Sequence, residues 1–403
     1  MIHGAEKGAS GAFDVDLRLE GTLVVPGGRL PRGVVLVRQG RVSYFGAAEG
    51  APAGRAARTE SCARGVITAG LVDLHVHGAA GADASDGTLE SLQTLCVAHA
   101  AAGTTGLCPT VLTSAPEVTL RALAAIRAAA ERGPLGARVL GAHLEGPFLN
   151  PAKAGAQPEE HLRLPDRALL REFLAAAEGT LKLVTLAPEL PGALELVAEL
   201  RSAGVTVAMG HSTASYAEAL QAIGAGCSVA THVFNAMPAL HHREPGLAGA
   251  ALLDERVVCE VIADGEHLHP ATVTLVHRLK GARGVCLVSD CLAAWRAPPG
   301  GFRLGERAVS VGRGVARLAD GTLAGAASPL ALGLSRYAAW TGGGDAAALE
   351  AAVSVPARLV GAETSATPSV GSWADLVHWG EGGEALAVWI GGVRCEDPGG
   401  PRP

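Results

Sequence analysis

The middle of this chain repeats one pattern eight times: a short apolar segment, then a longer and often alanine-rich segment. Short apolar runs of this kind are typical of buried strands. Most longer segments have the periodicity of amphipathic helices, as in TLESLQTLCVAHAAAG and APEVTLRALAAIRAAAERG. Eight consecutive strand–helix units favour a closed, TIM-like (β/α)8 barrel in an α/β protein, although periodicity alone leaves an open doubly wound sheet as an alternative. The predicted strands begin at Leu71, Thr104, Arg138, Leu181, Val205, Cys227, Val257 and Gly284.

Two β-rich regions flank this middle. LRLEGTLVVPG, GVVLVRQG and RVSYFG lie between about Asp14 and Ile67, and ADLVHWGEGG and ALAVWIGGVR lie near the other end. Alternating or β-branched residues between Gly and Pro breaks are typical of short strands. We therefore expect a small β-sandwich domain built from both termini. Residues 1–68 would form its first part, 69–360 the barrel, and 361–403 its second part and a tail.

Composition and charge exclude several classes of protein. The 403 residues are 48% hydrophobic, which is enough for a large core. A formal net charge of -6, without a block of Lys or Arg, argues against a nucleic-acid partner. No apolar run reaches the roughly 18–20 residues of a membrane helix, and the opening MIHGAEKGAS lacks the pattern of a signal peptide. We therefore expect no membrane partner. The eight cysteines include no CxxC pair, so we expect reduced core thiols and a cytoplasmic location.

Polar residues stand where the predicted strands end. The first strand, LVDLHVHGAAG, carries Asp73, His75 and His77 at alternate positions, and a period of two places them on one side of the strand. Asp73 lies deeper, where it could orient a histidine. The carboxyl ends of barrel strands share one mouth, so residues far apart in sequence would meet there. Later strands end in His143, Glu145, His211, His232 and Asp290.

This set of imidazoles and carboxylates predicts a metal site. The ligand types suit Zn, Fe or Mn and do not choose among them. Glu145, His211 and His232 would leave a fourth position for water, as a catalytic ion requires. His75 and His77 could hold a second ion beside it.

The predicted chemistry is hydrolysis. A bound ion lowers the pKa of its water toward roughly 7 and so supplies a hydroxide nucleophile. Asp290 would accept the water proton and deliver it to the leaving group. A single histidine at a strand end is more often structural, but five such groups at successive strand ends point to a metal site. We expect His143 to hydrogen-bond behind the metal ligands and not to be a ligand itself.

The segment after the sixth strand, THVFNAMPALHHREPGLAGA, is rich in groups that bind anions. Asn235 and the main chain at Ala236 can donate hydrogen bonds, and Arg243 offers a planar fork suited to phosphate or carboxylate. His267, after the seventh strand, could add a donor. The alternative is that Arg243 pairs with Glu244.

Seven motifs occur in a specific order: HLEGPFLNP, TLAPE, MGHSTASY, THVFNAMP, REPGLAGA, IADGEHLHP and VSDCLAA. Together they resemble the N-acetylglucosamine-6-phosphate deacetylase family of the amidohydrolase superfamily, over nearly the whole chain. The resemblance implies hydrolysis of the acetamide of N-acetylglucosamine 6-phosphate to glucosamine 6-phosphate and acetate. Zinc is the metal it favours, with Fe or Mn as alternatives and one or two ions per subunit.

The resemblance also implies residue roles. The main ion would be held by Glu145, His211 and His232, a second ion by His75 and His77, and Asp290 would be the general base and acid. Arg243 and His267 would bind phosphate across a homodimer interface, in the neighbouring subunit's site. The other substrate contacts it implies are Ala156, Gln157, Asn235, Ala236, Asp264, Leu323, Ala324 and Gly325.

Three positions depart from the family pattern. Gln157 stands where many members have histidine, Cys291 follows the acid in SDC where TDA is usual, and Ala326 replaces the serine of GTLAGS. These departures leave the sugar epimer and the acyl group open. The alternatives are a deacetylase of N-acetylgalactosamine 6-phosphate or of another N-acyl amino sugar, a ring-opening amidohydrolase, and a sugar-phosphate sensor without catalysis.

Overall fold

Eight parallel strands form a barrel in the computed structural model, which describes residues 14–25, 28–298, 302–304, 307–363 and 368–396. Neighbouring strands pair in sequence order, so the predicted barrel is confirmed. MIHGAEKGAS and the tail from residue 397 lie outside the described residues. The barrel strands are β5 (Leu71–Val76), β8 (Thr104–Leu112), β10 (Ala142–Glu145), β11 (Leu181–Leu186), β12 (Thr206–Met209), β13 (Val229–Ala230), β14 (Val258–Val261) and β15 (Val285–Leu287).

The seam between β15 and β5 closes through a few main-chain contacts. Val76 and Cys291 form an isolated parallel bridge. The carbonyl of Cys291 accepts from the N–H of His77 at 2.8 Å, and the carbonyl of His75 accepts from the N–H of Asp290 at 2.8 Å. The unusual Cys291 is therefore a buried seam residue, and the seam holds three of the predicted site residues in register.

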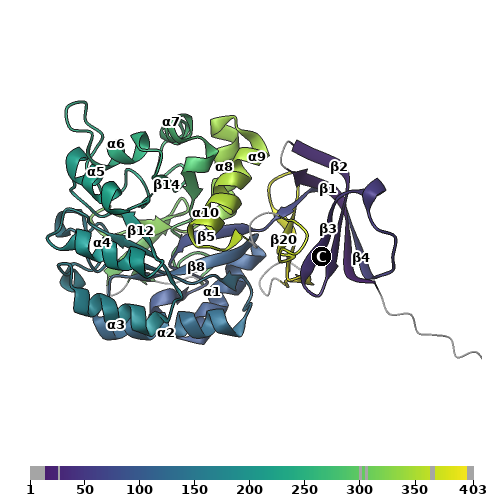
Figure 1. Cartoon of the computed structure of the whole chain (residues 1–403), viewed down its shortest axis with the longest axis horizontal. Coiled ribbons are helices and arrows are strands. Elements are labelled where there is room, and N and C mark those ends of the chain that lie inside the picture. The colour runs from purple at the N-terminus through teal and green to yellow at the C-terminus, as the bar shows by residue number, and fades with distance from the viewer. Residues whose placement is uncertain (1–13, 26–27, 299–301, 305–306, 364–367, 397–403) are drawn as a thin grey trace, which may run out of the picture.

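Helices surround the barrel (Figure 1). The two helices expected from sequence are present as α1 and α2. Side-chain caps begin several others, including the Ser215–Glu218 capping box of α5 and Asp166 at α3. The helices are α1 (Leu89–Ala101), α2 (Pro116–Arg132), α3 (Arg167–Ala177), α4 (Ala193–Ser202), α5 (Tyr216–Ala225), α6 (Gly246–Leu253), α7 (Pro270–Lys280), α8 (Leu330–Thr341), α9 (Gly344–Leu349) and α10 (Val355–Leu359).

Both ends of the chain build one small β-domain beside the barrel, as expected (Figure 1). Its strands pair into a single seven-stranded mixed sheet, in which β20 joins β4 antiparallel and β1 joins β4 in parallel. Its own core includes Leu19, Ile67 and Trp389, all fully buried. The division at residues 68 and 360 stays a prediction. The strands are β1 (Val15–Val25), β2 (Gly28–Arg38), β3 (Arg41–Ala47), β4 (Ala56–Ala69), β20 (Leu376–Trp379), β21 (Ala385–Ile390) and β22 (Val393–Arg394).

A four-stranded antiparallel sheet follows the eighth barrel strand, and the sequence analysis did not anticipate it. β19 joins it to the barrel, because Ala326 donates to the carbonyl of Asp290 at 2.8 Å and accepts from Leu292 at 2.9 Å. Buried Leu304 and Ala316 pack with Leu292 beneath it. Its strands are β16 (Phe302–Leu304), β17 (Arg307–Gly312), β18 (Val315–Arg317) and β19 (Leu323–Ala326).

Two further expectations concern membranes and cysteines. Among the helices of the described residues, none has the length and apolar character needed to cross a membrane. All eight cysteines are free thiols, and seven of them are buried, as predicted.

Candidate metal centre and substrate pocket

Glu145, His211 and His232 meet at the carboxyl ends of β10, β12 and β13. Oε1 of Glu145 lies 3.1 Å from Nε2 of His211 and 3.2 Å from Nε2 of His232. The two Nε2 atoms are 3.2 Å apart. Metal–ligand bonds of about 2.0–2.1 Å in a tetrahedron imply ligand–ligand separations of about 3.3 Å. The three ligand atoms are therefore spaced to share one ion.

A hydrogen bond on the far side of His211 also indicates a bound cation. Its Nδ1 lies 2.9 Å from the main-chain carbonyl of Lys153, to which it donates. In the neutral ring Nε2 then carries a lone pair, which faces a carboxylate oxygen. Two acceptors at this separation repel each other unless a cation lies between them, so the donor set fits a bound metal ion.

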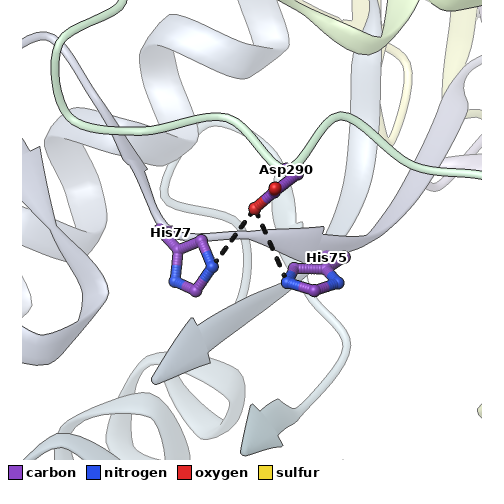
Figure 2. Close-up of side chains that lie close together, drawn as sticks. All are labelled: His75, His77 and Asp290. Atoms are coloured by element: carbon purple, nitrogen blue, oxygen red, sulfur yellow. Dashed lines mark ion pairs between the residues drawn. The ribbon is translucent and has the colours of Figure 1, made fainter. Parts of the chain in front are cut away.

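A second group lies beside the first, made by His75, His77 and Asp290 (Figure 2). Oδ1 of Asp290 is 3.6 Å from Nε2 of His75 and 3.3 Å from Nε2 of His77. Oε2 of Glu145 also lies 3.3 Å from Nε2 of His77, while its Oε1 faces the first group. Glu145 therefore lies between the two groups and reaches both.

Groups behind the ligands fix the orientation of both HxH rings. Nδ1 of His77 lies 3.2 Å from the carbonyl of Thr110, and Nδ1 of His75 lies 3.2 Å from Oε2 of Glu260. Sequence reasoning missed Glu260, although it is the only charged residue in the apolar segment VVCEVI. Asp73 does not orient an imidazole: its Oδ1 accepts from the main-chain N–H groups of His75 and Ser289 instead.

His143 lies behind the ligands, as the sequence analysis favoured. Its Nδ1 is 3.2 Å from the hydroxyl of Thr110 and its Nε2 is 2.9 Å from the hydroxyl of Thr185. Burial, followed by the charge of His75, holds the pKa of His143 well below its ordinary value. It is therefore a neutral ring whose two nitrogens are already partnered.

Buried carboxylates and imidazoles compensate one another's charge in this centre. Burial alone lowers the pKa of His75, but the charge of the nearby Glu145 carboxylate and the hydrogen bond to Glu260 hold it well above its ordinary value. Burial also lowers the pKa of His77, but hydrogen bonds to Asp290 and Glu145 outweigh that effect and raise the pKa to about 9. Burial alone raises the pKa of Glu145, yet the surrounding imidazoles hold it well below its ordinary value. The carboxylates are thus ionised and attract cations.

Three of these residues have a positive φ, which is uncommon outside glycine. His211, His232 and Asp290 have φ of 48°, 27° and 51°. Non-glycine residues in this left-handed backbone conformation concentrate at functional sites. Each ends the run of a barrel strand, so the turn directs its side chain over the mouth.

A cavity of about 300 Å³ opens above the centre. Most of the predicted substrate-binding residues line it, together with residues that sequence reasoning did not select. Leu112 ends the barrel strand β8 and Lys153 follows β10, whereas Leu304 lies on β16 and Thr322 directly precedes β19, so the four-stranded sheet forms one wall. The predicted residues that line the cavity are Ala156, Gln157, Asn235, Ala236, His267, Leu323, Ala324 and Gly325.

His267 requires a correction. We expected it to reach the neighbouring subunit's site, but it lines the cavity of its own chain. Its Nδ1 lies 2.6 Å from Oδ2 of Asp264, and its side chain is only 4% exposed. Asp264, three residues earlier, therefore holds the ring inward, and Asp264 itself lies behind the wall of the cavity.

Gln157 and Arg243 also differ in detail from expectation. The side-chain amide of Gln157 donates to Oε2 of Glu145 at 2.6 Å, and its carbonyl accepts from the N–H of Thr113 at 3.0 Å. It supports a predicted ligand as well as facing the cavity.

Arg243 is exposed outside the cavity and bonds to the ring of His242, while Glu244 accepts from main-chain groups of Tyr216 and Gly246. The alternative Arg243–Glu244 pair is not formed.

Known proteins similar to this chain include deacetylases of amino sugar phosphates, as their names state. The amidohydrolase family model matches residues 66–395. N-acetylglucosamine-6-phosphate deacetylase of Homo sapiens is 34% identical over 407 residues, covering 96% of this chain and 97% of that protein. N-acetylgalactosamine-6-phosphate deacetylase of Escherichia coli O157:H7 is 36% identical over 322 residues, covering 80% and 85%.

A solved structure resembles nearly the whole chain. N-acetyl-D-glucosamine-6-phosphate deacetylase of Mycobacterium smegmatis, a mutant in complex with N-acetyl-D-glucosamine-6-phosphate, superposes with a TM-score of 0.88 at 34% identity. The match covers 96% of this chain and 100% of that one. The likeness therefore includes the barrel, the small β-domain and the mouth where the predicted ligands meet.

Proposed function

Because this chain belongs to the amidohydrolase family, and within it to the N-acetylglucosamine-6-phosphate deacetylases, we propose that it hydrolyses the acetamide of N-acetylglucosamine 6-phosphate to glucosamine 6-phosphate and acetate. The chain is thus a hydrolase that acts on a linear amide. The observation that carries the proposal is the meeting of Glu145, His211 and His232 at ligand spacing beneath a cavity.

Glu145, His211 and His232 would hold the main divalent ion, zinc by preference. When bound, such an ion polarises the amide carbonyl and acidifies water. Around it the protein's own groups orient the reactants. Gln157 fixes the Glu145 carboxylate, and the carbonyl of Lys153 fixes the ring of His211.

Asp290 would move the proton. Burial alone raises its pKa, but the hydrogen bond with His77 and the charges of His75 and His77 lower it below its ordinary value. The carboxylate is therefore ionised and ready to accept a proton from water at the cavity floor. Delivering that proton to the amine nitrogen solves the main difficulty of amide hydrolysis, which is a poor leaving group.

The remaining pocket residues would place the sugar. The apolar wall of Leu323, Ala324 and Gly325 suits the acetyl methyl group, whereas Asn235, the main chain of Ala236 and His267 suit the 6-phosphate. A phosphate bound away from the reacting carbon supplies binding energy and orientation. Arg243, exposed on the surface, would add a phosphate contact in the partner of a homodimer.

The sugar epimer has a second candidate. The relative from Escherichia coli named for N-acetylgalactosamine 6-phosphate is 36% identical to this chain, within the 34–40% range of relatives named for the glucosamine substrate. The two sugars differ only at one ring hydroxyl, which one or two pocket contacts can discriminate.

We expect purified protein to contain a stoichiometric divalent ion and to release acetate from N-acetylglucosamine 6-phosphate faster than from the galactosamine epimer. Metal analysis and kcat/KM on both sugars test this. A higher kcat/KM on the galactosamine sugar would reverse the choice of epimer. Metal-loaded protein that releases no acetate from either sugar would contradict the proposed reaction.

Arg243→Ala should lower kcat/KM for the phosphorylated sugar by about 10- to 100-fold, because a hydrogen bond to a charged group contributes roughly 1.5–3 kcal/mol. Activity on free N-acetylglucosamine should not change. The matched control is Arg256→Ala, which removes another exposed arginine that pairs locally with Asp254. Equal losses on both sugars would remove Arg243 from phosphate binding.

We propose a cytoplasmic location, and the state of the thiols supports it. Seven of the eight free cysteines are buried, which suits a reducing compartment such as the cytoplasm.

A further inference from the structure

Glu260 is a buried carboxylate that the proposed reaction does not use. It lies on β14 between Cys259 and Val261 and has no exposed surface. Its Oε2 lies 3.2 Å from Nδ1 of His75 and also accepts from the main-chain N–H of His232 at 3.2 Å. Its Oε1 has no hydrogen-bond partner among the described residues. Burying a carboxylate with an unpaired oxygen costs free energy of folding, which indicates that Glu260 has a role beyond packing.

The first consequence is the orientation of His75. Because Nδ1 donates to Glu260, the ring presents Nε2 to the other side, and this atom offers a lone pair once a cation displaces its proton. That Nε2 is buried and has no hydrogen-bond partner within the part of the chain that the structure describes; it lies 3.4 Å from Oε1 of Glu145 and 3.6 Å from Oδ1 of Asp290. Carboxylates that hold the outer nitrogen of a ligand histidine in this way increase its basicity and fix its direction.

The second consequence is the balance of charge. His75 is surrounded by three buried carboxylates, those of Glu145, Asp290 and Glu260. Among the described residues no Lys or Arg forms an ion pair with any of them. One divalent ion compensates two of these charges, and the third favours a second cation in the same space.

We propose that Glu260 is a positioning residue that gives this chain a second divalent-ion site at His75, His77 and Asp290, by fixing the His75 ring and supplying the third negative charge. Through the N–H of His232, the same oxygen also links this site to the main one. The inference rests on the proposed function, because it concerns the metal centre of that reaction.

Titration of metal-free protein with Zn²⁺, followed by metal analysis, tests the proposal. The wild type should bind two ions per subunit. Glu260→Leu should retain the main ion and lose the second. Glu260→Gln keeps an acceptor for His75 but lacks the charge, so its second ion should bind about 10- to 100-fold more weakly, the usual effect of removing a partner of a ligand.

Two control variants separate positioning from loss of packing. His75→Asn removes a ligand of the second site directly and should match Glu260→Leu in metal content. Cys259→Ala alters the adjacent buried side chain of the same strand and should still bind two ions. A single ion in the wild type, or an unchanged second affinity in Glu260→Gln, would overturn the inference. Two bound ions without acetate release would instead overturn the deacetylase proposal and leave this one standing.

Discussion

Asp290→Asn should lower kcat on N-acetylglucosamine 6-phosphate by about 10²- to 10⁴-fold, the range that a positioned proton donor and acceptor contributes. The amide has the same shape as the carboxylate but cannot accept the water proton. The main chain should not change, because Asp290 has a φ of 51° and asparagine tolerates this left-handed conformation as well as aspartate does. An alanine at this position would add backbone strain to the loss of the carboxylate.

Metal analysis must accompany the kinetics, because Asp290 lies 3.3 Å from Nε2 of His77 and belongs to the second candidate group. The main ion should remain, since Glu145, His211 and His232 are unaltered. Asp375→Asn is a suitable control: this carboxylate is also buried, but it pairs with Arg138 at the small β-domain. Turnover near the wild-type rate in Asp290→Asn would remove Asp290 from proton transfer.

The barrel and most of its ligands were predictable from sequence because both depend on short-range regularities. A period of two placed His75 and His77 on one side of a strand, and the position of Glu145 at the end of its strand placed it at the shared mouth. Parallel strands in a closed barrel need no further information to bring such residues together. The wall of Leu323–Gly325 followed from motif resemblance and not from any periodicity.

What the sequence did not reveal depends on contacts between distant segments. Glu260 resembles any polar interruption of an apolar strand until its 3.2 Å contact with His75, 185 positions away, is known. The inward direction of His267 depends on Asp264, which a motif comparison treated only as a sugar contact. The four-stranded sheet was missed because its strands are short, three to six residues each, and β17 is largely exposed, so they lack a clear apolar pattern.

Glu145→Gln should have the widest effect on metal binding of any single substitution in the centre. Glu145 has one oxygen toward His211 and His232 and the other toward His77. Removing its charge weakens both groups at once, so Zn²⁺ affinity of the main site should fall by more than about 100-fold, since even partners behind the ligands contribute 10- to 100-fold. Turnover should fall with it. Isothermal titration of the metal-free variant, together with metal analysis, measures the loss.

The same variant has a pH signature in metal-free protein. The raised pKa of His75 and the lowered pKa of Glu145 arise largely from each other. A raised histidine pKa stabilises the fold fully below the unfolded value near 6.5, and a lowered glutamate pKa does so above about 4.3. Glu145→Gln should therefore reduce the melting temperature most between about pH 4.5 and 6.5, and the difference should shrink as pH rises through the folded pKa of His75.

Glu260→Gln is the matched control, because it makes the same carboxylate-to-amide change in the same buried centre. It should weaken only the second ion, whereas Glu145→Gln should weaken both, since only Glu145 contacts the ligand atoms of both groups. If Glu145→Gln kept the main ion at wild-type affinity, Glu145, His211 and His232 would not share a cation. The hydrolysis proposed for this chain would then have no site.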